Sequence, residues 1–342
     1  MPLHFRRTSA PSTVTIDAPA RLHLGFLDPS GSLGRVFGSL GLVIDGAGTE
    51  LEARLAETDS IAGTMTDSER ARIGWCLERL HAAYGPTRVA FNVLRTPRAH
   101  SGLGSGTQLA LTIGAAYARL TGLTTTTAEL AHLLGRGGRS GIGILGFDSG
   151  GLLLDGGAPR DRGGAGVPPL VARQPFPDAW RVMLVTDTSR EGLSGEAERR
   201  GLAALAPFPQ QLAAHLCHLV LMRILPGAAD GDFDAFAHGI TEMQQIIGEY
   251  FAPVQGGVFA SPDVEAALRA AAAGRPAGIG QTSWGPTGFA FLPSALEADA
   301  ALVAARAAVR DKPHIECAVC AARNRGAVIR VAGALDARVD AA

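Results

Sequence analysis

The chain has 342 residues, of which 46% are hydrophobic and 18% charged, and its formal net charge at pH 7 is −1. So apolar a composition excludes a disordered chain, and the length favours two domains or lobes. The nearly neutral charge excludes recruitment of nucleic acid or an anionic membrane by a global field, so an anionic ligand would need local donors.

The N-terminal residues 1–12 contain two arginines but no apolar run behind them. This pattern predicts a tail and not a signal peptide. No stretch of about 18 uncharged apolar residues occurs in the chain, so no membrane span is predicted.

In the first half of the chain, alternation predicts strands and helical spacing predicts helices between them. The strands are expected at 13–16, 40–44, 51–54 and 89–94, and the helices at 68–84, 109–120 and 127–134. Gly46 and Gly48 are predicted to form a turn between two strands. Ser68 is the expected N-cap of the first helix.

The second half begins after a glycine-rich segment at 135–157 and a Gly-, Pro- and Arg-rich connection at 156–178. Strands are expected at 180–186, 278–292, 315–321 and 328–331, and helices at 209–250, at 263–273 and around residue 302. Strands and helices mix without strict βαβ alternation, which indicates an α+β fold.

The most informative stretch is 97–109, PRAHSGLGSGTQL, a glycine-rich loop between a predicted strand and a predicted helix. Glycine lets the backbone take positive φ and approach a ligand, and the first helical N–H groups lack an intrahelical partner. The loop therefore predicts a phosphate site. Its residues are Ser101, Gly102, Leu103, Gly104, Ser105, Gly106 and Thr107. The alternative is a tight turn capped by Ser105.

Two further motifs lie on either side of this loop in the sequence. At 18–35, APARLHLGFLDPSGSLGR, Arg21 and His23 share one face of an extended segment, and a PSG turn separates Asp28 from Arg35. At 278–291, GIGQTSWGPTGFAF, glycines bound a loop in which polar donors stand beside a tryptophan ring. That loop contains Gln281, Thr282, Ser283 and Trp284.

Neither the cysteines nor the histidines show a metal-binding pattern. The cysteines are Cys76, Cys217, Cys317 and Cys320. Cys317 and Cys320 form a CxxC on an expected strand, where residues three apart face opposite sides, and no second ligand pair exists. Core thiols are expected, which fits a reducing cytoplasm. His215 and His218 share one expected helix without a third ligand in view, so helix packing is the expectation.

Taken in order, the RLHLG, GLGSG and C-terminal glycine motifs resemble the GHMP small-molecule kinase superfamily. The chain is most similar to its β-ribofuranosylaminobenzene 5′-phosphate synthase branch, whose hallmarks look like RLHLGFLD, GSLGR, HSGLGSGTQ, RSGIG, GGLLLDGG and GIGQTSWGPTGFA here. The resemblance covers nearly the whole chain after about residue 13. It implies a two-lobed α+β fold of the GHMP kinase type with mixed and antiparallel sheets, and lobes at 13–175 and 176–342.

The resemblance also implies an activity, a decarboxylating C-phosphoribosyl transfer. That family condenses phosphoribosyl pyrophosphate (PRPP) with 4-aminobenzoate or 4-hydroxybenzoate and releases carbon dioxide and pyrophosphate, a step of tetrahydromethanopterin biosynthesis. Three alternatives stay open: a C-nucleoside synthase of the same family that uses a heteroaromatic acid, an ATP-dependent small-molecule kinase, and a phosphate-sensing domain without catalysis.

One departure from the kinases concerns the segment after the middle helices, where they commonly carry SG-x-D. The matching stretch here is Ser140, Gly141, Ile142 and Gly143, so a glycine replaces the carboxylate that assists the phosphoryl acceptor. This favours a reaction that releases pyrophosphate. Asp148 lies five residues further on and could substitute for that carboxylate.

The site residues follow as hypotheses. Asp28, Arg35 and Asp148 are assigned to catalysis. PRPP is assigned to Arg21, His23, His100, the loop 101–107, Arg139 and Ser140. The aromatic acid is assigned to Gln281, Thr282, Ser283 and Trp284. Turn capping is the alternative for the aspartates, and core packing for His23 and Trp284.

Mg²⁺ is the expected cofactor, because hard oxygen ligands suit it. The candidate metal ligands are the carboxylates of Asp28, Asp148, Asp155 and Asp187, and the sequence does not discriminate among them. Asp155 and Asp187 are the working hypothesis for the metal site. The expected partners are PRPP and an aromatic carboxylic acid. The resemblance implies a homodimer, and the expected core thiols fit a cytoplasmic location.

Overall fold

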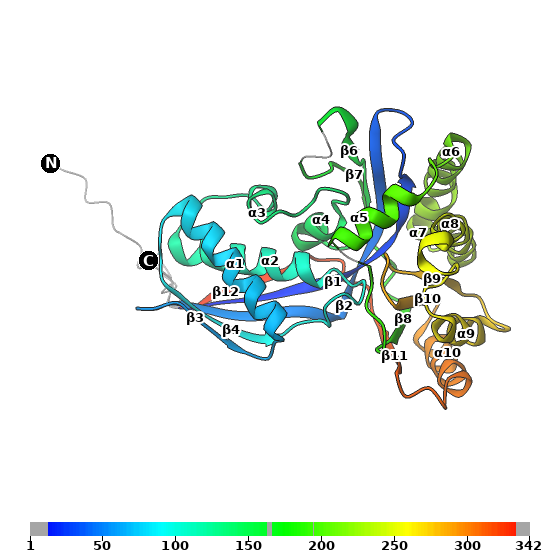
Figure 1. The fold of residues 1–342 in the computed structure, drawn as a ribbon. Helices are drawn as coiled ribbons and strands as arrows, with labels where there is room; N and C mark the ends of the chain where they lie inside the picture. The colour runs from blue at the N-terminus through cyan, green and yellow to red at the C-terminus, as the bar shows by residue number, and fades with distance from the viewer. Residues whose placement is uncertain (1–12, 163–165, 194, 333–342) are drawn as a thin grey trace, which may run out of the picture.

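The computed structural model describes residues 13–162, 166–193 and 195–332, so the predicted tail at 1–12 lies outside the described residues (Figure 1). Two sheets are each covered by their own helices, and long strands reach from one group of elements into the other. This arrangement confirms the α+β prediction.

The first sheet is built around two long antiparallel strands. It contains β1 (Thr13–Asp28), β2 (Arg35–Leu55), β3 (Ser60–Gly63), β4 (Val89–Arg95), β5 (Leu152–Asp155), β6 (Ala158–Pro159), β7 (Leu170–Gln174) and β12 (Val328–Ala332). The strand order is β12-β1-β2-β4-β3, and β5 and β6 pair with β2 while β7 pairs with β5. Only β3 and β4 are parallel among the pairs of this sheet in the described residues.

The predicted turn at Gly46 and Gly48 is wrong, because β2 runs through both glycines. Gly46 has a φ of 86°, and the register against β1 shifts between Ala18 and Ala20 on the opposite strand. A Cβ at Gly48 would collide with the carbonyl of Ala18. The glycines therefore permit an irregularity within a paired strand.

Helices α1 (Asp67–Tyr84) and α2 (Ser105–Thr121) cover one face of this sheet, with α3 (Thr127–Leu133) and α4 (Ile142–Ser149) beside them. The N-cap of α1 is Thr66 and not the predicted Ser68. Thr66 and Glu69 form a reciprocal capping box, which satisfies backbone N–H groups at both residues.

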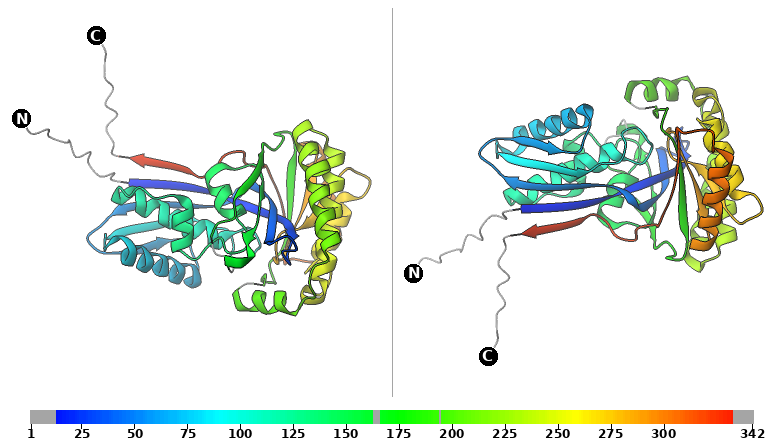
Figure 2. Two further views of the ribbon diagram at one scale, coloured as in Figure 1. Left: turned by 90° about the horizontal axis from the view of Figure 1, so that it is seen from above. Right: turned by 90° about the horizontal axis from the view of Figure 1, so that it is seen from below.

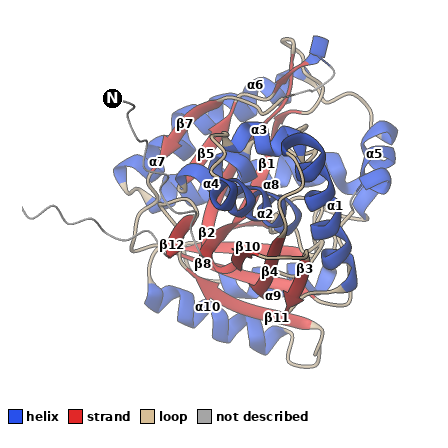
Figure 3. Ribbon diagram, turned by 90° about the vertical axis from the view of Figure 1, so that its left-hand side faces the viewer, coloured by secondary structure: helices blue, strands red, loops and turns tan. Residues whose placement is uncertain are grey.

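The second sheet is antiparallel, with the order β11-β8-β10-β9. Its strands are β8 (Arg181–Asp187), β9 (Gly278–Gln281), β10 (Thr287–Leu292) and β11 (Ile315–Cys320). Helices α9 (Pro262–Ala272) and α10 (Ala295–Ala308) pack on one face, and α8 (Phe233–Gln255) packs on the other (Figures 2 and 3).

The remaining helices precede α8. They are α5 (Gly195–Ala204), α6 (Gln210–Leu219) and α7 (Leu225–Asp230), with a short 3₁₀ turn at Arg160–Arg162 and a π-helical turn at Val220–Ile224 that joins α6 to α7. By length and apolar composition, the continuous run Gln210–Asp230 could cross a membrane. It also carries Arg223, and its buried residues Leu216, Val220 and Ile224 belong to the main core.

The two groups of elements share one large core. Helix α8 contacts both β9 and β1, and a cluster of edge-to-face and tilted rings joins Phe176, Trp180, Phe236 and Phe291. Strand β12 pairs with β1 although it falls in the predicted second lobe. The site described next lies where these groups meet.

Candidate functional site

A cleft of about 940 Å³ brings the three sequence motifs together. The predicted site residues that line it are Arg21, His23, His100, Gly102, Gly104, Ser105, Gly106, Thr107, Arg139, Ser140, Ser283 and Trp284. These residues come from β1, from the loop into α2, from the loop before α4 and from the loop between β9 and β10. The cleft therefore joins segments that are far apart in the sequence.

The glycine loop enters α2 as an uncapped helix N-terminus. Gly104 is the N-cap in a left-handed conformation, with a φ of 82°, and no side chain bonds to the first turn. The alternative in which Ser105 caps a turn is therefore wrong. Arg21 Nη1 donates to the carbonyl of Gly102 at 2.5 Å, and a Cβ at Gly104 would lie 3.2 Å from Arg21 Nε. The first N–H groups and the helix dipole are thus free to favour an anion.

The glycine loop packs directly against the C-terminal loop. A Cβ at Gly285 would lie 2.6 Å from the Cα of Gly102. Thr282 Oγ1 donates to the carbonyl of Gly102 at 2.9 Å and accepts from the N–H of His23 at 2.9 Å. Thr282 is fully buried, so it fixes the two loops relative to β1 and does not line the cleft.

Strained backbone collects at this cleft. Among the described residues, the non-glycine positions with positive φ are Phe37 (71°), His100 (57°) and Ser283 (53°), and all three line the cleft. Such conformations cost of the order of 1–3 kcal/mol each and persist where the surrounding structure holds them. The arrangement is typical of a functional site.

Several charged groups that line the cleft are partly or fully withdrawn from water. Arg139 Nη2 and Glu198 Oε2 form an ion pair at 2.7 Å. Burial raises the pKa of Glu198 and lowers the pKa of Arg21 to about 10. Burial, followed by the charges of Arg21 and Arg139, lowers the pKa of His23 to about 3, so the imidazole is neutral. Its Nε2 is buried without a hydrogen-bond partner in the described structure.

Comparison with known proteins places this chain in a family. The chain matches the GHMP kinases N terminal domain over residues 71–150 and the GHMP kinases C terminal domain over residues 224–311. It is 36% identical over 237 residues to the beta-ribofuranosylphenol 5′-phosphate synthase of Archaeoglobus fulgidus. The matched region covers 67% of this chain and 74% of that protein. The protein of the same name from Methanothermobacter thermautotrophicus is 32% identical over 247 residues, with 67% and 74% covered.

The chain belongs to the beta-ribofuranosylphenol 5′-phosphate synthase family. Solved structures agree with the fold. A homoserine kinase from Cytophaga hutchinsonii aligns with a TM-score of 0.66 and 16% identity over 96% of this chain and all of that one. A mevalonate diphosphate decarboxylase from Staphylococcus aureus aligns with a TM-score of 0.63 and 14% identity, over 93% and 98%.

The position that the resemblance assigns to the kinase carboxylate is tightly packed in this chain. Gly143 is buried in the first turn of α4, and a Cβ there would lie 3.2 Å from Cγ2 of Thr107. A side chain at this position would need the methyl group of Thr107 to give way by a few tenths of an ångström. The position is therefore tight for any residue larger than glycine.

The structure does not support the predicted catalytic roles of Asp28, Arg35 and Asp148. Asp28 accepts hydrogen bonds from the backbone N–H groups of residues 30, 31 and 32, and so it caps the turn between β1 and β2. Arg35 donates to the carbonyls of Gly156 and Gly157 at 2.6 Å. Asp148 accepts from Thr127 Oγ1 at 2.5 Å. None of the three lines the cleft, because each is used to hold a turn or a neighbouring element.

The predicted metal ligands are also used elsewhere. Asp155 accepts from the N–H groups of Ser39, Gly141 and Gly157 and from the Ser140 hydroxyl. Asp187 accepts from residues 189 and 261 and pairs with the guanidinium of residue 190. Neither lines the cleft, and the described residues contain no cluster of three or more His, Cys, Asp or Glu suited to a metal. The donor set therefore does not fit an Mg²⁺ ion held by protein carboxylates.

Four other predicted residues lie behind the cleft wall. Gln281 is buried and bonds to Ala260 N and Gln255 Oε1, and Thr282 joins the two loops as described. Ser101 turns its hydroxyl to the carbonyl of Arg98, and Leu103 is part of the core. These residues shape the loops without touching the space inside.

Sequence reasoning missed several charged residues of the cleft, namely Arg72, Arg136, Glu198 and Arg199. Arg72 projects from α1, and Glu198 and Arg199 project from α5. No local pattern marks them, since they reach the site only through tertiary packing. Arg136 had a usable signal, because it stands in the glycine-rich run GRGGRS beside Arg139.

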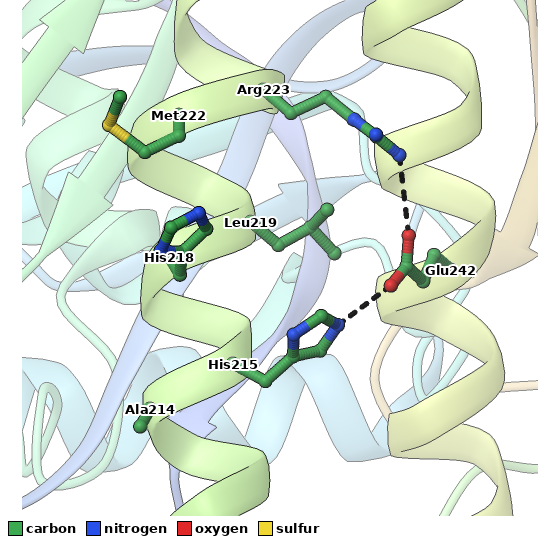
Figure 4. Close-up of a pocket in the computed structure, with 7 residues that line it drawn as sticks. All are labelled: Ala214, His215, His218, Leu219, Met222, Arg223 and Glu242. Carbon is green, nitrogen blue, oxygen red and sulfur yellow. Dashed lines mark hydrogen bonds and ion pairs between the residues drawn. The ribbon is translucent and has the colours of Figure 1, made fainter.

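A second hollow of about 580 Å³ lies on the outer side of α6 and α8 (Figure 4). There Glu242 pairs with His215 Nε2 at 2.7 Å and with Arg223 Nη1 at 3.5 Å. His218 lines the hollow without joining this pair of contacts. The three side chains are exposed, and the carboxylate of Glu242 faces the positive charge of Arg223. This arrangement agrees with helix packing as the expected role of these histidines.

Proposed function

We propose that this enzyme is a decarboxylating C-phosphoribosyltransferase that condenses PRPP with 4-hydroxybenzoate or 4-aminobenzoate. The observation that carries the proposal is the uncapped N-terminus of α2, which opens into a cleft lined by five arginines and a single carboxylate. Such a site suits a ligand with several negative charges. The name of the relatives describes a product made of a ribofuranosyl 5′-phosphate and a phenol, and PRPP supplies the first part.

The cleft also offers a place for an aromatic ring. His23, Phe26 and Phe37 form a continuous wall, with ring centroids 4.5 Å and 4.9 Å apart, and Trp284 also lines the cleft. Aromatic rings pack well on such walls in edge-to-face or offset arrangements. A heteroaromatic acid would fit the same wall and is the alternative acceptor.

In the proposed reaction, the C1–O bond of PRPP breaks and its electron pair leaves with the diphosphate. The ring carbon that bears the carboxylate bonds to C1, and the electrons of its bond to the carboxylate restore aromaticity as carbon dioxide departs. The residues of the chain stabilise charge and orient the two substrates, through the α2 N–H groups, Ser105, Thr107 and the arginines. This step needs no base to take a proton from the ring carbon.

Mg²⁺ remains part of the proposal as an ion that travels with the diphosphate. Magnesium commonly retains waters and binds substrate phosphates together with only one or two carboxylates. Among the described residues, Glu198 is the only carboxylate that lines the cleft, and it already pairs with Arg139. We therefore assign no protein residue to the metal. A cytoplasmic homodimer that acts in tetrahydromethanopterin biosynthesis completes the proposal, and it rests on the family resemblance.

The proposal is tested by incubating the purified protein with PRPP, Mg²⁺ and each aromatic acid. We expect equal amounts of pyrophosphate and carbon dioxide, and a C-ribosyl phosphate by mass spectrometry. The control is ATP with the same acids, for which no phosphorylated product is expected because the kinase carboxylate is replaced by Gly143. Phosphoryl transfer from ATP without carbon dioxide release would overturn the proposal in favour of a kinase.

A further inference from the structure

Two arginines of the cleft lining lie together over the start of α2. Arg72 comes from α1 and Arg136 from the segment after α3, and both lie over Gly106 in the first turn of α2. A Cβ added at Gly106 would collide with Nη1 of Arg72 and would lie 3.6 Å from Nη1 of Arg136. Two cationic groups thus converge on the helix end that already favours an anion.

Nothing in the described parts of the chain neutralises this pair. Neither guanidinium has an ion pair or a hydrogen bond there, and Arg136 Nε is buried without a partner. Burial and then the charge of Arg72 lower the pKa of Arg136. Two like charges brought together away from water are unfavourable unless a ligand supplies the opposite charge.

Arg21 and Arg139 differ, because the carboxylate of Glu198 lies beside them, although Nη1 of Arg139 is also buried without a partner in the described structure. Arg139 pairs with Glu198 at 2.7 Å, and the charge of Glu198 also acts on Arg21. Arg199 also lines the cleft without an ion pair in the described structure, but it is exposed on α5. Arg72 and Arg136 are therefore the unpaired cations that lie over the N-terminus of α2. Of the two phosphate-bearing ends of PRPP, the diphosphate carries more negative charge.

We propose that Arg72 and Arg136, together with the first turn of α2, bind the diphosphate end of the substrate. This inference rests on the proposed function. The assignment orients PRPP, with its diphosphate over Gly106 and its ribose toward the aromatic wall. When the C1–O bond breaks, the departing diphosphate gains the electron pair, and the two guanidiniums stabilise that charge without a proton transfer.

The experiment titrates inorganic pyrophosphate and, separately, ribose 5-phosphate into the full chain at constant Mg²⁺, by calorimetry. We expect Arg72→Gln and Arg136→Gln each to weaken pyrophosphate binding about tenfold or more, since each removes charge-assisted hydrogen bonds. Ribose 5-phosphate affinity should stay within about twofold. Arg119→Gln is the matched control, because it removes the same charge from an exposed position on α2 and should leave both affinities unchanged.

A folded double variant that binds pyrophosphate as the wild type does would overturn the assignment, as would a wild type that does not bind pyrophosphate. If either glutamine variant fails to fold, the lysine variants Arg72→Lys and Arg136→Lys keep the charge and remove the bidentate fork. An intermediate loss of pyrophosphate affinity then supports the assignment, and no loss contradicts it. A different outcome would separate this site from the proposed function. If the wild type turns over no aromatic acid but the arginine variants still lose pyrophosphate affinity, the diphosphate site stands and the proposed function is rejected.

Discussion

His23 is kept uncharged in a cleft full of arginines. The backbone N–H of His23 donates to Thr282 Oγ1 at 2.9 Å. The imidazole ring packs edge-on against Phe26, and its pKa is lowered to about 3. A neutral imidazole adds no repulsion to the cationic groups around it, while its Nε2 is buried and has no hydrogen-bond partner among the described residues. The residue therefore contributes an uncharged ring to the wall of the cleft.

The lowered pKa of His23 predicts a dependence of stability on pH. Unfolded histidine binds its proton near pH 6.5 and folded His23 only near pH 3, so the unfolded state binds more protons between these values. Stability from this residue is complete above about pH 6.5 and falls as the pH falls toward 3. Between pH 7 and pH 5 the wild type should lose about 2 kcal/mol more than His23→Gln, measured as unfolding free energies in urea.

Burial also raises the pKa of Glu198 and of Asp155, so these carboxyls contribute to the dependence of stability on pH. The comparison with His23→Gln removes their shared contribution. Equal losses of stability in the two proteins would show that His23 titrates normally. The absolute stability of the variant does not enter the test, since only the change with pH is compared.

At single residues, the sequence predicted backbone roles better than side-chain chemistry. The conformation of the glycine loop and the helix that follows it were predictable because positive φ and a helix start are local properties, and its role as a phosphate site stays a prediction. Asp28 and Asp155 were chosen because carboxylates beside glycines also occur in metal and catalytic sites, whereas here they cap turns. Arg72 could not be found from the sequence, since only the packing of α1 against α2 brings it to Gly106.

Among the elements, α4 depends on a carboxylate outside itself. Asp155 ends β5, and its oxygens accept from Ser39 of β2, from Gly141 at the N-cap of α4 and from Gly157. The side chain is 1% exposed. One carboxylate thus ties two strands to the start of the helix whose preceding loop lines the cleft.

Asp155→Asn should therefore destabilise the protein by about 2 kcal/mol or more, because an amide nitrogen would face backbone N–H groups that lose their acceptor. The measurement is thermal unfolding. Asp148→Asn is the control, since that exposed carboxyl bonds only to Thr127 and should cost less than about 1 kcal/mol. Below its melting temperature the folded Asp155→Asn protein should bind pyrophosphate with Mg²⁺ normally. A lost affinity at unchanged melting temperature would restore the metal role.

Element types were predictable wherever the pattern was long and local. The strand at 89–94 and the helix at 127–134 agree with β4 and α3 within one residue. The long β2 was divided in two because Gly46 and Gly48 look like a turn in isolation. Pairing with β1 at Ile44 and again at Thr49 holds the strand on both sides of the glycines, and such pairing is a tertiary effect.

At the scale of the whole molecule, the two sheets meet through close backbone contact at the cleft. Gly102 and Gly285 face each other without side chains between them, while α8 and the long β1 join the cores behind. The sequence predicted that these loops belong to one site, from motif order and family resemblance. It did not predict the return of β12 to the first sheet, because strand partners are not encoded in a short alternating pattern.

Gly285→Ala tests whether this backbone contact holds the cleft together. The added Cβ would lie 2.6 Å from the Cα of Gly102 and 2.6 Å from the carbonyl oxygen of Ser101, both of which are backbone atoms that cannot turn aside. The two loops must then separate, at a cost of about 1–3 kcal/mol typical of overpacking. Because Gly102 leads into the N-terminus of α2, pyrophosphate affinity should fall together with the melting temperature.

Gly74→Ala is the matched control: nothing lies within 4 Å of its added Cβ, and an alanine inside α1 should stabilise the protein by about 0.5–1 kcal/mol. If Gly285→Ala retained both the stability and the pyrophosphate affinity of the wild type, the two loops would have to be able to part without disturbing the site, and the packing of glycine on glycine would have no part in forming it.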